Sequence, residues 1–271
     1  MAAIGEIRPW KTETPGERLF LLVYELTKDS LAPRQSDQSW IVSATGLREF
    51  TRLVAAMELM HRCLNVAVES IQANPHCSPA AIRRDLRSSV ELYVGDAILG
   101  PISEQSRLAA IAYLEQKLSN GKKNLTHRQE RPYCCWCGKH TSRAKSATLG
   151  ADIATVEHLW PEYLGGTSIE ENLTIACKAC NSARQHAFTW AWFALQACNE
   201  ELDSHNSLPR HIYLALALHR LIRVASGQTR IARNPVSLKE ASKILQGAIP
   251  KVDLQPNRRY TFFEIVQLSM E

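Results

Sequence analysis

The sequence predicts a mostly α-helical protein with a small α+β insert in its middle. Long stretches carry apolar residues at every third or fourth position, which is the period of an amphipathic helix. One central region differs, because residues 153–156 and 172–176 are β-prone and are separated by a turn at 164–167. The hydrophobic content of 45% and the charged content of 22% are typical of a globular chain, and 271 residues suffice for one large or two small domains.

Helical periodicity and helix-end signals position the predicted helices. The longest candidate is 43–71, where the apolar stripe is continuous. Ser78 followed by Pro79 predicts an N-cap and a first helical turn. A turn at 119–121 is expected to end the helix before it. The predicted helices cover residues 16–30, 43–71, 79–92, 103–118, 187–202, 209–226 and 235–247.

A change in composition marks the start of the insert. Residues 121–145 contain seven Lys or Arg side chains and a single acid, Glu130. We therefore predict an N-terminal helical region at 1–121, a central core at 122–200, and a C-terminal helical region at 201–271 that packs on the core.

The distribution of basic residues favours a polyanionic partner. The formal net charge is +5, and residues 210–238 hold five arginines and no acid. This segment is either a solvated helix face or a stripe that contacts phosphates. Arg220 and Arg223 are the candidate nucleic-acid contacts in it. Arg143 and Lys145 are two more, in a long link that we interpret as a substrate-facing loop.

Nothing in the sequence indicates a membrane protein or a secreted one. No apolar run reaches the ~18 residues that a membrane span requires. The polar start, which includes Glu6, does not resemble a secretory signal. We therefore expect a cytoplasmic protein, in which clustered cysteine pairs indicate metal ligands rather than disulfides.

Two Cys-x-x-Cys pairs predict a structural zinc site. Cys134 with Cys137, and Cys177 with Cys180, each place two thiols on a tight turn. Together the two turns supply the four ligands of a closed tetrahedral zinc site, which is structural rather than catalytic. Cys135 adds a third thiol to the first pair, so its competition for zinc stays open, although the spacing favours its two neighbours. The alternative is that these are core cysteines.

An acid–histidine dyad stands between the two cysteine pairs. Glu157 and His158 follow the first β-prone run, Asn172 begins the second, and Asn181 begins a helix after Cys180. Adjacent residues at a strand end face opposite sides. Glu157 could therefore hold a metal while His158 faces a water. A structural histidine is the alternative for His158.

The string from Val156 to Arg184 resembles the HNH endonucleases of the ββα-metal class, in the subtype stapled by four cysteines. The resemblance covers one fifth of the chain. It departs from the family in having Glu157 where Asp is usual. Some relatives place another ligand four residues after the position of Asn181, where this chain has Gln185, with His186 next to it. The matching features are Cys134-x-x-Cys137-Gly138, Glu157-His158, Pro161, Gly165-Gly166, Asn172-Leu173 and Cys177-x-x-Cys180-Asn181.

The resemblance implies a role for each matched residue. His158 would be the general base that activates water, since the ordinary pKa of histidine lies near neutral pH. Glu157 and Asn181 would hold one catalytic divalent ion, Mg2+ or Mn2+, through hard oxygen ligands. Asn172 would pin the loop and orient His158, and Arg184 would contact the phosphate backbone.

The function implied is a metal-dependent endonuclease that hydrolyses phosphodiester bonds of DNA and nicks one strand per event. The resemblance extends to bacterial nucleases of anti-phage defence or restriction, for which a partner protein could dock on the helical flanks. Two alternatives remain: a non-catalytic zinc module that binds nucleic acid, and a regulatory protein with a vestigial insert. The joint presence of Glu157, His158 and Asn181 counts against both.

Overall fold

The computed structural model describes residues 8–30, 45–92, 94–115, 118–143, 150, 152–184, 202–203, 210–229, 231–245 and 259–260. These residues are mostly helical, with one small antiparallel hairpin beside a group of four cysteines, so the predicted fold class is confirmed. Of the predicted helix at 187–202 only Leu202 is described, and it begins a short strand instead. None of the described helices is both long enough and apolar enough to cross a membrane.

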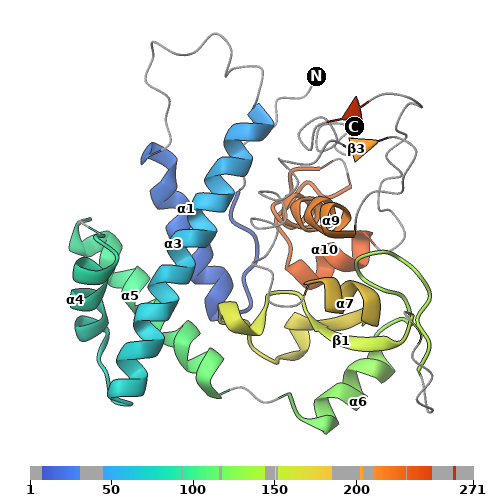
Figure 1. Ribbon diagram of the computed structural model, residues 1–271, viewed down its shortest axis with the longest axis horizontal. Helices are drawn as coiled ribbons and strands as arrows, with labels where there is room; N and C mark the ends of the chain where they lie inside the picture. The colour runs from blue at the N-terminus through green and yellow to red at the C-terminus, as the bar shows by residue number, and fades with distance from the viewer. Residues whose placement is uncertain are drawn as a thin grey trace.

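Four helices form a block at the N-terminal side of the molecule (Figure 1). They are α1 (Pro15–Ser30), α3 (Thr45–Ala73), α4 (Pro79–Ser89) and α5 (Asp96–Glu115). Helices α1, α3 and α5 contact one another around fully buried side chains such as Phe20, Met57 and Ile102. Helix α4 begins as predicted, because the Ser78 side chain accepts a hydrogen bond from the backbone N–H of Ala81. Helix α5 begins seven residues before the predicted start and contains Pro101.

The predicted turn at 119–121 is instead the start of another helix, α6 (Asn120–Gln129). Ser119 is its N-cap, since the Ser119 side chain accepts from the backbone N–H of Lys122. A serine followed by asparagine and glycine suits an N-cap as well as a turn. Only Thr126 of α6 is buried, so the helix lies at the surface.

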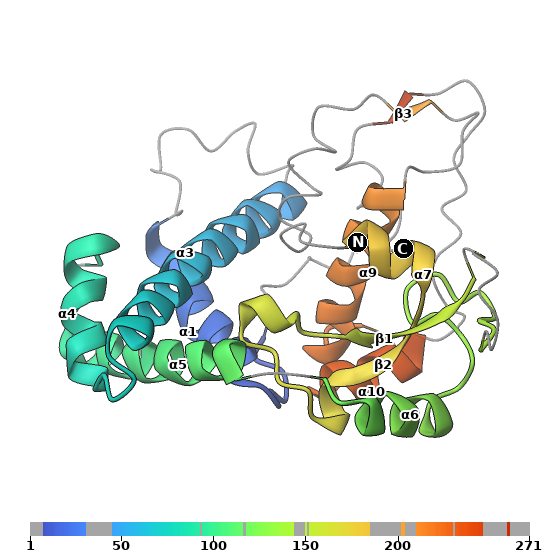
Figure 2. The ribbon, with the colours of Figure 1, turned by 60° about the horizontal axis from the view of Figure 1, so that its bottom comes forward.

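The central core is a hairpin followed by a short helix. Strand β1 (Ala154–His158) pairs antiparallel with β2 (Leu173–Cys177), and Glu157 faces Thr174 across the ladder. Every residue of β2 is buried. The connection contains two 3-10 turns, η2 (Glu162–Leu164) and η3 (Glu170–Asn172), and α7 (Lys178–Arg184) follows β2 directly. Helices α6 and α7 both contact the hairpin and lie on opposite sides of it (Figures 1 and 2).

Two helices of the C-terminal part of the chain pack on this core. Helix α9 (Arg210–Ala225) contacts α7 and α10 (Leu238–Leu245), and α10 reaches η3. These helices correspond to the predicted ones at 209–226 and 235–247. Two short strands, β3 (Leu202–Asp203) and β4 (Arg259–Tyr260), also pair.

Two glycines let the helical block approach the connection between β1 and β2 closely. The backbone N–H of Gly16 donates to the carbonyl of Gly165 at 3.1 Å. A Cβ on Gly16 would lie 2.0 Å from the Leu164 carbonyl oxygen, and one on Gly165, whose φ is +74°, would lie 2.5 Å from the Ala109 Cβ. One cluster of buried side chains runs through all three predicted regions and marks no boundary between them. The domain boundaries therefore stay a prediction.

Candidate active site and metal centre

The four cysteines of the two Cys-x-x-Cys pairs meet in space as expected. Their sulfur atoms all lie within 4.8 Å of one another, and those of Cys137 and Cys177 are 3.8 Å apart. A tetrahedron with zinc–sulfur bonds of about 2.3 Å has edges of about 3.8 Å, so the group could hold zinc. It is the one such group among the described residues.

Local geometry turns the four thiols toward one point. The backbone N–H groups of Cys137 and Cys180 donate to the sulfurs of Cys134 and Cys177, at 3.5 Å and 3.4 Å. Gly138 has φ of 67°, a left-handed conformation that only glycine adopts without strain, and its N–H closes the first turn on the Cys134 carbonyl. The second turn leads directly from β2 into α7.

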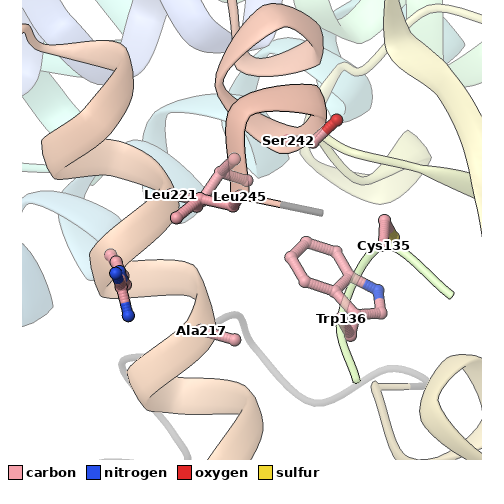
Figure 3. Close-up of a pocket in the computed structure, with 7 residues that line it drawn as sticks. Cys135, Trp136, Ala217, Leu221, Ser242 and Leu245 are labelled. Carbon is pink, nitrogen blue, oxygen red and sulfur yellow. The ribbon is translucent and has the colours of Figure 1, made fainter. Parts of the chain in front are cut away.

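Cys135 lies outside the four-sulfur group. Its N–H donates to the Ile175 carbonyl, and its side chain lines a small pocket with Trp136 and with Leu221 of α9 (Figure 3). Burial raises the pKa of the Cys135 thiol, and the neighbouring Cys134 raises it further. Because the Cys135 sulfur is not among the four that gather at one point, this geometry favours the four other cysteines.

Glu157 is buried against Arg184 of α7. The two side chains form an ion pair and are 5% and 6% exposed. Arg184 also donates to the backbone carbonyls of His158 and Leu159, at 2.6 Å and 2.7 Å, and its guanidinium lies over the Trp136 ring. Burial raises the pKa of Glu157, and the charge of Arg184 opposes that rise.

The position of Arg184 differs from the one expected of a phosphate contact. A buried guanidinium requires acceptors, and here a carboxylate and two carbonyls of the chain itself satisfy it. We therefore assign Arg184 to the support of β1. The Glu157 oxygen that Arg184 does not bind, Oε2, is the one that could bind a cation.

Removal of Arg184 is expected to destabilise the core strongly. Arg184→Leu leaves a buried carboxylate without its partner, which typically costs about 3–5 kcal/mol. Adding Glu157→Gln should recover part of that loss. Denaturant unfolding of both variants measures the effect, with Arg84→Leu on the exposed face of α4 as the control. A stable Arg184→Leu protein with weakened DNA binding would restore the phosphate-contact role.

His158 lies at the end of β1 with its ring held from one side. Its Nε2 is 2.9 Å from Ser168 Oγ and 3.7 Å from Glu162 Oε1. The Ser168 hydroxyl donates to Glu162 at 3.5 Å, so its oxygen is available to accept the Nε2 proton. That tautomer leaves Nδ1 unprotonated. Burial, together with the nearby Arg184, lowers the pKa of His158 to about 4, so the ring is neutral near pH 7.

Asn172 fixes the connection between the strands. Its Oδ1 accepts from the N–H of Trp160 at 2.7 Å, and its Nδ2 donates to the carbonyls of Trp160 and Thr167, both at 2.9 Å. These bonds pin the start of the loop against its end. The ring contact of His158 is made by Ser168 and Glu162, two residues that the sequence-based prediction omitted.

Asn181 joins α7 to β1. Its Nδ2 donates to Thr155 Oγ1 at 2.9 Å and to the Val156 carbonyl at 3.3 Å. The amide nitrogen is thereby committed to the strand, which leaves Oδ1 as the atom that could bind a cation. Glu157 and Asn181 thus provide the hard oxygen donors that suit Mg2+ or Mn2+.

Comparison with protein-family models matches this segment to a known family. Residues 134–187 match the model described as HNH endonuclease. They form an HNH domain. The match begins at the first zinc-type cysteine and extends just past Arg184, so it includes the hairpin and α7. The chain matches no curated protein and no solved structure.

The basic residues predicted to bind nucleic acid are dispersed around the HNH domain. Arg143 is exposed in the segment before β1, and Lys145 lies outside the described residues. Arg220 and Arg223 are half-buried on α9, and Arg220 lines the pocket beside Trp136. The described part of α9 therefore does not present the fully solvated stripe that its composition suggested.

Proposed function

We propose that the chain is a metal-dependent endonuclease that hydrolyses phosphodiester bonds of DNA, one strand per event. The observation that supports this most directly is the state of His158 in the HNH domain. Its ring is neutral, its Nε2 is tied to Ser168, and its Nδ1 is the nitrogen left to take a proton. A general base must be unprotonated and fixed in orientation; at a pKa of about 4 the ring meets the first condition but accepts a proton less readily than an ordinary histidine.

In this proposal His158 Nδ1 removes the proton from the water that attacks phosphorus. Ser168 and Glu162 hold the ring through Nε2 and stabilise the imidazolium that forms. Asn172 keeps the loop against β1, and the four cysteines would hold a structural zinc that joins the hairpin to the first cysteine turn. A Mg2+ or Mn2+ ion on Glu157 and Asn181 would supply positive charge to the phosphate and the departing 3′ oxygen.

Ser168→Ala is expected to lower kcat by about tenfold to a hundredfold with little change in KM, because the ring loses its orienting partner. Ser168→Thr keeps a hydroxyl and should restore most of the rate. Steady-state cleavage of a labelled duplex measures both constants. Equal losses in the alanine and threonine variants would mean that packing, and not the hydroxyl, is what matters.

Supercoiled plasmid tests the function itself. Wild-type protein loaded with zinc should convert it to open circles when Mg2+ or Mn2+ is added, with linear DNA appearing only later. In a parallel reaction, a single-stranded RNA tests whether the cleavage activity is restricted to DNA. If linear DNA formed from the start, the protein would cut both strands together rather than nick one strand per event.

The alternative function is a zinc module that binds nucleic acid without cutting it. The burial of Glu157 against Arg184 favours this alternative, because that ion pair by itself gives the carboxylate a structural role. The two functions separate cleanly: a binding module retards DNA in a gel but leaves plasmid supercoiled with every divalent ion tested.

We also propose a role in bacterial anti-phage defence, in the cytoplasm, with a partner protein that docks on the helical block. Support comes from the Glu-His-x-x-Pro form of the motif, Glu157 to Pro161, beside large helical flanks. Phage plating on cells that carry the wild-type chain or His158→Ala tests the role. Equal phage plating on the two strains would contradict the proposed role in defence.

A further inference from the structure

Helix α6 and the segment that follows it expose an unusual concentration of positive charge. Helix α6 precedes the matched HNH segment, which starts at residue 134. Six cations between residues 118 and 143 are exposed, and we call them the basic surface: Lys122, Lys123, Arg128, Arg131, Lys139 and Arg143. None of the six forms an ion pair with another residue that the structure describes.

The single acid in this stretch does not neutralise the basic surface. The Glu130 side chain is only 6% exposed and binds the Lys239 ammonium of α10 at 3.0 Å. That lysine also donates to the Glu170 carbonyl at 2.6 Å, which ties α10 to the loop before β2. The carboxylate is therefore directed inward, and the exposed charges around it stay unopposed. Cations held close together repel one another, and a bound polyanion relieves that repulsion, so such a surface attracts polyanions.

The basic surface lies beside the candidate active site. Helix α6 contacts both β1 and β2, on the side of the hairpin opposite α7 (Figures 1 and 2). His158 ends β1, the strand that α6 contacts, and its ring is held by Ser168 and Glu162 of the connection.

The basic surface continues on both sides of the first cysteine turn. Tyr133 and His140 form an antiparallel bridge, so the chain before the first cysteine turn runs beside the chain after it. Tyr133 is 44% exposed, with its ring 5.4 Å from that of His140. Along the chain, cations of the basic surface thus flank one exposed aromatic pair on both sides.

We propose that the basic surface binds the backbone phosphates of the nucleic-acid duplex whose strand is cut, and so positions that strand at His158. This inference rests on the proposed function for the identity of the substrate. It assigns substrate binding to α6, outside the matched HNH segment, in place of Arg184 and α9. Duplex nucleic acid fits because phosphates recur at a regular spacing along it and are met by cations on an exposed surface.

Salt-dependent binding tests the proposal without relying on cleavage. The full-length, zinc-loaded chain carries His158→Ala in every arm, and the probe is a fluorescent 30-base-pair duplex of arbitrary sequence. Lys123→Gln with Arg128→Gln removes two charges from α6. Arg62→Gln with Arg84→Gln removes two exposed charges from the helical block and is the matched control.

The α6 pair is expected to bind about tenfold more weakly at ~0.15 M salt, with a slope of log affinity against log salt less steep by about two. The control pair should match the parent. Equal slopes for the two pairs would overturn the proposal, even if wild-type protein cuts DNA. Loss of binding to anionic phospholipid vesicles with no loss on the duplex would also overturn it. Absence of cleavage by wild type would instead count against the proposed function and leave this binding result to stand.

Discussion

Replacement of Cys177 by serine is expected to unfold the HNH domain and release its zinc. Structural zinc contributes about 10 kcal/mol or more to the folding of small metal-stapled units. Cys177 ends β2 and opens the turn into α7, so its loss disconnects the hairpin, the helix and the first cysteine turn together. Zinc content and the denaturant midpoint of the purified variant measure the effect.

Cys135→Ser is the matched control for this change. Cys135 is adjacent to the zinc-type cysteines but lies outside their group, so its variant should keep one zinc per chain. A Cys177→Ser protein with full zinc content and an unchanged midpoint would show that the sulfur group is core packing. Loss of zinc from Cys135→Ser alone would place the metal on a different set of thiols.

His158→Ala is expected to lower the single-turnover rate of cleavage by about 10²- to 10⁴-fold, the usual contribution of a general base. The side chain is 12% exposed and makes its ring contacts with Ser168 and Glu162, so its removal should leave the zinc site and DNA affinity nearly intact. Rates from excess enzyme on a nickable duplex, paired with binding by anisotropy, separate the two effects. Parallel loss of binding and cleavage would indicate a structural histidine.

Local signals in the sequence were sufficient for the scaffold of the site. Each Cys-x-x-Cys turn encodes its own geometry, and the β-prone runs next to them bring both turns to one end of a hairpin. Asn172 was expected as a loop anchor from the family resemblance, and its position before β2 lets it reach backbone groups at both ends of the connection.

The surroundings of the dyad could not be predicted in this way, since they depend on burial. Arg184 reads as a surface cation at a helix end, but α7 packs it against Glu157 beneath the strand. Ser168 carries no motif, and only the folding of the 159–172 connection brings it to His158. Glu130 likewise reads as a solvated acid until α10 supplies Lys239.

One plasmid assay tests the central claim most directly. Supercoiled DNA is incubated with wild type, His158→Ala and His76→Ala, the last an exposed histidine between α3 and α4, with Mg2+, with Mn2+ and with no added divalent ion. Metal-dependent open circles from wild type and His76→Ala, with none from His158→Ala, are the predicted result. Equal nicking by His158→Ala, or no cleavage by wild type with either ion, would contradict the account.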